Sequence, residues 1–193
     1  MDLPGEAADA PPPFQRALAS LRTARVRPEV SVQPAQAPQR LAPYATALSA
    51  TVTRADTELA SGRLFVLYDP QGQTGWEGTF RAVTYVSAEL EPEIAADPLL
   101  PSVGWSWLTE MLEAHGASHV AASGTVTRVV SESFGGMADE PATSEVELRA
   151  SWTPVSEELD RHLYAWCDVL CLAAGIPPLP PDVTAMPERP DGP

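Results

Sequence analysis

In residues 143–152, TSEVELRASW, polar and apolar side chains alternate strictly from Glu145 to Trp152. A period of two is typical of a β-strand, because successive side chains of a strand point to opposite faces of its sheet. The apolar side chains are Val146, Leu148, Ala150 and Trp152, and the polar ones are Glu145, Glu147, Arg149 and Ser151. The segment therefore predicts a strand of an antiparallel sheet with one buried face and one wet face.

Other segments predict the remaining strands. Residues 28–34, PEVSVQP, are expected to form a short edge strand, because proline within a sheet is tolerated at its edges. Residues 62–70 are apolar on both faces, which is typical of a central strand covered on two sides. Residues 79–90 follow across a loop with three glycines, which indicates an antiparallel hairpin. Two more strands are expected within 44–54 and 123–134.

Three segments have the spacing of amphipathic helices. They are expected at residues 14–25, at residues 102–115, and from near Thr153 to Gly175. The last helix has the clearest signals, because Pro154 falls in its first turn and a glycine followed by prolines marks its end.

The order of these elements favours a single α+β domain, because strands joined by hairpins replace the regular strand and helix alternation of parallel folds. We expect a mainly antiparallel sheet of about five to six strands packed with an N-terminal, a central and a C-terminal helix. This domain is expected to span residues 14–176. The flanking segments, residues 1–13 and 177–193, are rich in proline and acidic residues, and we expect them to be disordered.

The charge of the chain restricts its partners. The formal net charge is -14, with 26 acidic residues against 12 basic ones, all of them arginine. Direct binding to nucleic acid requires a basic face that displaces counterions. The chain offers one local cluster, Arg22, Arg25 and Arg27, so we expect no direct contact with nucleic acid.

The sequence also favours a cytoplasmic protein. It has no apolar run long enough to span a membrane, and it opens with an acidic, proline-rich segment in place of a secretory signal. Cys167 and Cys171 are four residues apart in a helical pattern, a poor geometry for a disulfide bond. We expect both cysteines to be reduced residues of the core.

Three tryptophans are candidates for a binding surface. Trp105 shares the apolar face of the predicted central helix, which indicates core, and Trp107 lies at the border of that face. For Trp107 a core boundary is favoured, and a partner surface stays open. Trp76 lies in the glycine-rich hairpin loop, where it would either anchor a partner or fold back to cap the sheet.

A search for catalytic or ligand motifs predicts no catalytic residue, no cofactor and no metal. Gly116 separates His115 from His119 and is expected to end the helix, so the pair would not form a metal-binding face. The carboxylates of ELEPE, residues 89–93, could serve acid and base chemistry or hold a cation. A solvated acidic turn is the favoured interpretation of that segment.

Several segments of the chain resemble a known family, the actinobacterial proteins grouped as domain of unknown function 3000. The resemblance spans residues 11–180 and rests most clearly on PPPFQRALASLR, GRLFVLYDPQGQTGWEGTFR, SGTVTRVVSESFGG and WCDVLCLAAGIPP. It implies no activity, cofactor or catalytic residue, because none is established for the family. Relatives are often encoded near a ribonuclease D-like exonuclease, which implies a hypothesis of accessory function in RNA processing.

The leading hypothesis is a non-enzymatic protein-binding or adaptor domain. The residues expected on its partner surface are Trp76, Trp107, Arg16 and Arg22. The partner is expected to be another protein, and assembly with a second copy of the chain stays open.

Two alternatives remain. One is a small-molecule binding protein or enzyme with a pocket between the sheet and the central helix. The residues expected at that pocket are His115, His119, Ser131 and Ser133. The other is an accessory protein to an RNA-processing exonuclease, which would contact the enzyme and not the RNA.

Overall fold

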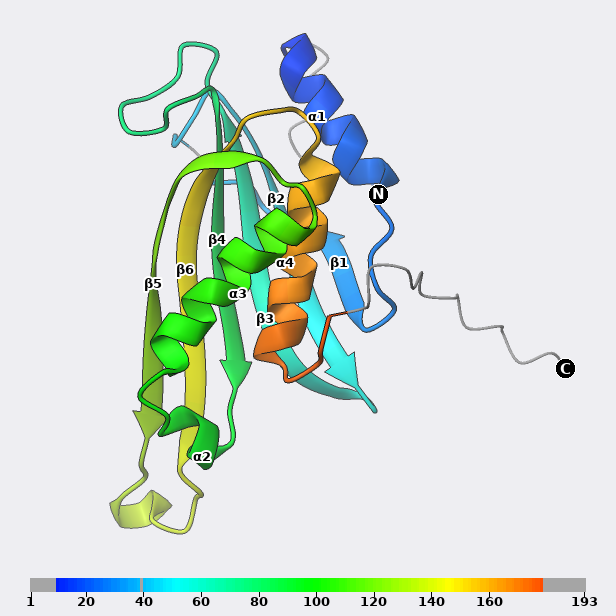
Figure 1. Ribbon diagram of the computed structural model, residues 1–193. Helices are drawn as coiled ribbons and strands as arrows, with labels where there is room; N and C mark the ends of the chain where they lie inside the picture. Colours follow the sequence, from blue (N-terminus) through cyan, green and yellow to red (C-terminus); the bar gives the residue numbers. More distant parts are fainter. Residues whose placement is uncertain (1–9, 39, 179–193) are drawn as a thin grey trace, which may run out of the picture.

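The computed structural model describes residues 10–38 and 40–178. These residues form one six-stranded sheet with the strand order β1-β2-β3-β4-β6-β5 (Figure 1). Every neighbouring pair of strands is antiparallel. The strands are β1 (Val30–Pro34), β2 (Tyr44–Arg54), β3 (Thr57–Tyr68), β4 (Phe80–Glu89), β5 (His119–Ser131) and β6 (Thr143–Pro154).

The three long helices lie on the same face of this sheet (Figure 1). The helices are α1 (Pro12–Thr23), α2 (Pro92–Ala95), α3 (Leu100–Ala114) and α4 (Leu159–Ala173), with a 3-10 turn at Gly135–Met137. Within the described residues, no helix covers the opposite face of the sheet. The structure confirms the predicted α+β fold with its antiparallel sheet and its N-terminal, central and C-terminal helices.

The core lies between the sheet and α4. Trp152 of β6 and Trp166 and Leu170 of α4 are fully buried there. Gly62 of β3 allows the close approach of α4, because a Cβ atom at this position would lie 3.0 Å from Cδ2 of Leu170. The same Cβ would lie 2.9 Å from the carbonyl oxygen of Tyr85, so this position has no room for a larger residue.

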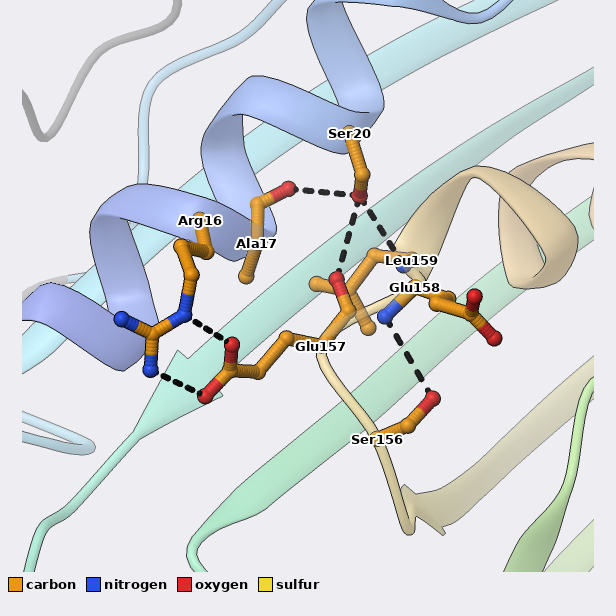
Figure 2. Close-up of polar contacts among 7 residues, drawn as sticks. All are labelled: Arg16, Ala17, Ser20, Ser156, Glu157, Glu158 and Leu159. Carbon is orange, nitrogen blue, oxygen red and sulfur yellow. Dashed lines mark hydrogen bonds and ion pairs between the residues drawn. The ribbon is translucent and has the colours of Figure 1, made fainter.

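The start of α4 is held by α1 (Figure 2). Its N-cap residue, Glu158, makes no capping hydrogen bond with its own side chain. Instead, the Leu159 backbone N–H donates to Oγ of Ser20 in α1 at 3.0 Å. The hydroxyl of Ser20 therefore performs the capping role from another helix, which satisfies one of the free N–H groups of α4.

Arg16 and Glu157 form a second link between these elements (Figure 2). Nη2 of Arg16 donates to Oε1 of Glu157 at 2.9 Å, and Nε donates to the other carboxylate oxygen. The hydrogen bonds from Arg16 hold the pKa of Glu157 below its usual range. Because the pair is largely exposed, we expect it to orient α1 more than to stabilise the fold.

Several predicted boundaries are wrong at one end. The last helix begins at Leu159 and not near Thr153, because Thr153 and Pro154 complete β6 beside β5. Strand β3 begins five residues before the predicted 62–70. The first helix starts at Pro12, since proline is well suited to a first helical turn.

The predicted tails lie mostly outside the described residues. At the boundary, the carbonyl oxygen of Pro177 accepts a hydrogen bond from Arg27 at 3.0 Å. Strand β3 also differs from its prediction as a strand covered on two sides, because its second apolar face lies away from the helices. Phe65 on that face is partly exposed, whereas Leu67 is buried beside Arg81.

Candidate binding surfaces

The four residues predicted for a partner surface do not lie together. Trp107 is half-buried in α3, packs against the core and lines a groove at the end of β4. Trp76 is half-buried in the loop before β4, about 30 Å away along that strand. Its carbonyl oxygen accepts a hydrogen bond from Thr153, which ties the loop to the sheet. Arg16 pairs with Glu157, and Arg22 lies in the last turn of α1.

The residues predicted for a pocket are also separated. His119 begins β5 and Ser131 ends it, so about 40 Å of extended strand lies between them. His115 is the C-cap residue of α3, and Ser133 follows β5. The sequence suggested that these residues border a pocket between the sheet and the central helix. In the structure, β5 runs the length of the sheet and separates the histidines from the serines (Figure 1).

His115 instead belongs to a polar network between helices. Its Nε2 atom lies 2.7 Å from Oδ2 of Asp168, a residue of α4 that is more than nine-tenths buried. The other carboxylate oxygen of Asp168 accepts a hydrogen bond from Nη1 of Arg27 at 3.4 Å. Arg27 also contacts Glu29. This network joins α3, α4 and the segment after α1, and we interpret it as structural.

The cysteines near this network are poor nucleophiles. Cys167 and Cys171 are free and buried. Burial raises the pKa of Cys171 to about 11 and that of Cys167 well above its usual range. Both thiols are therefore protonated at neutral pH, whereas a nucleophilic or metal-binding cysteine reacts as the thiolate.

A groove at the end of the sheet combines apolar and acidic residues. We call it the acidic groove, and its cavity volume is about 540 Å³. Its main apolar residues are Leu59, Leu90, Ile94, Trp107 and Leu172, and its carboxylates are Glu58, Glu89 and Glu91. All three glutamates are exposed, and the groove has no basic lining residue among those the structure describes.

The C-terminal end of α4 adds to the negative potential of the acidic groove. The last residues of this helix and its cap, from Leu172 to Gly175, line the groove. Backbone carbonyl groups at a helix C-terminus carry partial negative charge and favour cations nearby. Leu90 fixes the opposite wall, because its backbone N–H donates to the carbonyl oxygen of Ser144 at 2.8 Å.

The sequence identified parts of this groove but not the whole. Trp107 and the carboxylates of residues 89–93 were both singled out, the first as a core boundary or partner contact and the second as a solvated turn. The residues after α4 had no sequence signal for binding. They reach the groove only because α4 runs along the sheet in the same direction as β4, so that the two elements end close together (Figure 1).

The described residues contain no candidate metal site and no candidate membrane-spanning helix. In residues 10–38 and 40–178, no three His, Cys, Asp or Glu side chains are grouped so that they could hold a metal ion. None of the helices in this part of the chain has the length and apolar character needed to cross a membrane.

The comparisons with known proteins give a family and no activity. No curated protein and no solved structure matches the chain. One family profile, described as "Protein of unknown function (DUF3000)", matches residues 10–184. This match covers every residue that the structure describes, and the chain belongs to that family.

Proposed function

We propose that the protein is a binding protein whose acidic groove receives a basic and apolar segment of a partner protein. The observation that carries this proposal is the composition of the groove, in which three exposed glutamates and a helix C-terminus surround apolar residues. An apolar side chain of the partner would enter beside Trp107. A neighbouring arginine or lysine would lie against the glutamates.

The apolar part of the groove supplies the affinity in this proposal. The side chain of Ile94 is 51% exposed and Trp107 is half-buried, so both have surface left to cover. Burying one large apolar side chain typically contributes about 1.5–3 kcal/mol. Tryptophan is also enriched among the residues that dominate binding at protein interfaces.

The glutamates supply selectivity. Complementary charges steer association and disfavour partners of the wrong sign more than they increase affinity. A groove with only acidic charges therefore favours a basic segment over an acidic one. This selectivity matters in a chain with a net charge of -14, which repels acidic partners in general.

A peptide selection on the full chain tests the proposal. Random peptides displayed on phage would be selected at moderate salt, and we expect enrichment of peptides with a Leu, Phe or Trp next to Arg or Lys. The triple variant Glu58→Gln, Glu89→Gln, Glu91→Gln should weaken the selected peptides at least about tenfold. Ile94→Ala should weaken them by a smaller factor.

A matched control has the same net charge as the triple groove variant. The variant Glu110→Gln, Glu113→Gln, Glu132→Gln also removes three exposed carboxylates, but none of them lines the groove. It should bind the peptides like the parent chain. Enrichment of acidic peptides, or equal losses in the two triple variants, would contradict the proposal.

A further inference from the structure

The face of the sheet without helices carries a second site, which does not depend on the acidic groove. Across β3, β4 and β6, the register places Phe65, Val83 and Ser151 side by side, with Ser123 of β5 next to Ser151. Residues of this row line a hollow of about 510 Å³. We call it the arginine hollow, because arginines lie on both sides of the row.

Arg81 lies on one side of the hollow and is buried. Arg81 is 8% exposed. None of its hydrogen-bond partners among the described residues is a carboxylate. Nη1 donates to the carbonyl oxygen of Ala121 at 2.9 Å and to Oγ1 of Thr153 at 3.1 Å. Burial lowers the pKa of Arg81, and the charge of Glu77 offsets this effect only in part.

A buried cation whose hydrogen bonds all go to neutral groups is unfavourable, even with the charge of Glu77 nearby. Charged groups inside proteins are generally paired, because hydroxyl and carbonyl oxygens replace water only partly. A β-bulge in β5 brings the carbonyl oxygen of Ala121 to the guanidinium of Arg81. The register shifts between Val120 and Ser123, and Ala121 adopts a φ of 52°, an unusual value for alanine.

The hydroxyls of Ser123 and Ser151 connect Arg81 to the hollow. Nη2 of Arg81 donates to Oγ of Ser151 at 2.6 Å and to Oγ of Ser123 at 3.4 Å. Both serines line the hollow. Because each oxygen accepts from the guanidinium, each hydroxyl proton is left to donate elsewhere. The neighbouring cation makes both hydroxyls better donors to an anion in the hollow.

Arginines also lie on the other side of the row. The next row of the sheet contains Arg63, Tyr85 and Arg149, in that order across β3, β4 and β6. Arg149 lies over the ring of Tyr85, 5.4 Å from its centroid, and forms an ion pair with Glu147 at 2.7 Å. Its side chain is 60% exposed.

The floor of the hollow is apolar. Phe65, Val83 and Tyr85 line it and are each only partly buried. A ligand for this site therefore needs an apolar body as well as a negative charge. The hollow is shallow and open to solvent, so a bound ligand would keep part of its surface exposed.

We propose that the arginine hollow binds a small organic carboxylate, with its head group at Ser123 and Ser151 and its apolar body on Phe65, Val83 and Tyr85. Arg81 acts behind the serines as the fixed positive charge. A carboxylate fits better than a phosphate, because one buried guanidinium balances one negative charge and because the floor is apolar.

Titration of the full chain with defined probes tests this assignment. The probes are cinnamate and 4-methylpentanoate, the primary amide of each, and inorganic phosphate, with binding followed by ligand-observed NMR and calorimetry. We expect each carboxylate to bind at least about tenfold more tightly than its amide and than phosphate. Failure of both carboxylates to bind at millimolar concentration, or equal binding of acid and amide, overturns the proposal.

Variants locate the binding. Ser123→Ala with Ser151→Ala keeps the arginines and should weaken the carboxylates about tenfold. Arg81→Met should abolish their preference over the amides, and circular dichroism checks that it is folded, because the change leaves the Ala121 carbonyl oxygen without its donor. Arg54→Gln, an exposed arginine at the end of β2, is the matched control and should bind like the parent. Unchanged binding in both hollow variants places the probes elsewhere and overturns the assignment.

Discussion

The two faces of the sheet use the same six strands for different purposes. On the face under α4, alternate residues such as Trp152 and Leu148 are almost fully buried. On the other face, the intervening residues Tyr85, Arg149 and Ser151 keep part of their surface exposed. Because successive side chains of a strand point to opposite faces, each strand contributes to both.

We expect the covered face to contribute mainly to stability and the uncovered face mainly to binding. Close packing under the helices leaves no volume for a ligand, and changes there are felt as lost stability. The uncovered face has space and tolerates charge, so three of the arginines gather around its hollow. Changes on this face should alter binding more than folding, and the following measurements challenge that distinction.

The largest effect is expected for Trp166→Ala on the covered face. This residue is fully buried in α4, and removing a buried tryptophan side chain typically costs about 3–5 kcal/mol. Phe65→Ala on the uncovered face should cost clearly less, because Phe65 is partly exposed. Urea unfolding followed by circular dichroism compares the two variants. Equal losses would show that the uncovered face is as important for stability as the covered one.

A conservative change at Trp166 sharpens this result. Its indole Nε1 is buried and has no hydrogen-bond partner among the described residues. Trp166→Phe should therefore lose much less than Trp166→Ala, because it keeps most of the volume and removes an unsatisfied donor. A loss as large as that of the alanine variant would indicate that the indole N–H has a favourable contact.

The titration of His162 reports on the stability of the covered face. His162 is buried, accepts a hydrogen bond from Nε1 of Trp152 at 3.0 Å, and has its pKa lowered to about 4 by burial. Between pH 6.5 and 4 the unfolded chain binds a proton at this histidine and the folded chain does not, so stability falls as the pH falls. The contribution is complete above pH 6.5 and about 3 kcal/mol is lost near pH 4.

Urea unfolding at several pH values measures this effect. In His162→Phe the part of the pH dependence due to this histidine should disappear, while the part due to carboxylates remains. His119→Gln tests the smaller cause of the shift, because the charge of His119 also lowers the pKa of His162. The same pH profile in His162→Phe as in the parent chain would show that the histidine does not titrate in this range.

Gly124 in β5 pairs with Ala150, a buried residue of the covered face, and its backbone lines the hollow on the other side. A Cβ atom here would lie 2.5 Å from the carbonyl oxygen of Arg149 and 2.8 Å from Cζ3 of Trp105. Gly124→Ala should therefore destabilise the fold by about 1–3 kcal/mol. Because Gly124 also lines the hollow, the variant should weaken carboxylate binding even where the chain is folded. Gly136→Ala, in an open turn, is the control and should change neither property.

The sequence predicted the fold wherever the signal was local. The bounds of β2 agree with the predicted 44–54, because alternation and propensity are properties of neighbouring residues. Pro154 misled the prediction for α4, since a proline suits a first helical turn as well as the end of a strand. Only the position of β6 beside β5 decides between these alternatives.

The sites were less predictable because folding assembles them from distant segments. Arg81 sits in an alternating strand, where its sequence pattern indicates an ordinary residue on a wet face. Its burial depends on Ala121, Ser123, Ser151 and Thr153, which lie 40 to 72 residues away. The acidic groove likewise joins the start of β3, the end of β4 and the end of α4. No local pattern reports such contacts.

The smallest effect is expected from the Ser20 hydroxyl, one of the polar contacts between α1 and the start of α4. Ser20→Ala removes the hydroxyl that caps α4 from α1, and loss of a helix cap typically costs about 1 kcal/mol. Urea unfolding should detect this loss, and Ser20→Thr should recover part of it because a hydroxyl is retained. Ser102→Ala in α3 is the control, since its hydroxyl bonds only to Leu99 within its own turn. If Ser20→Ala is as stable as the control, the capping hydroxyl does not contribute to stability; in either case carboxylate binding on the uncovered face should be unchanged.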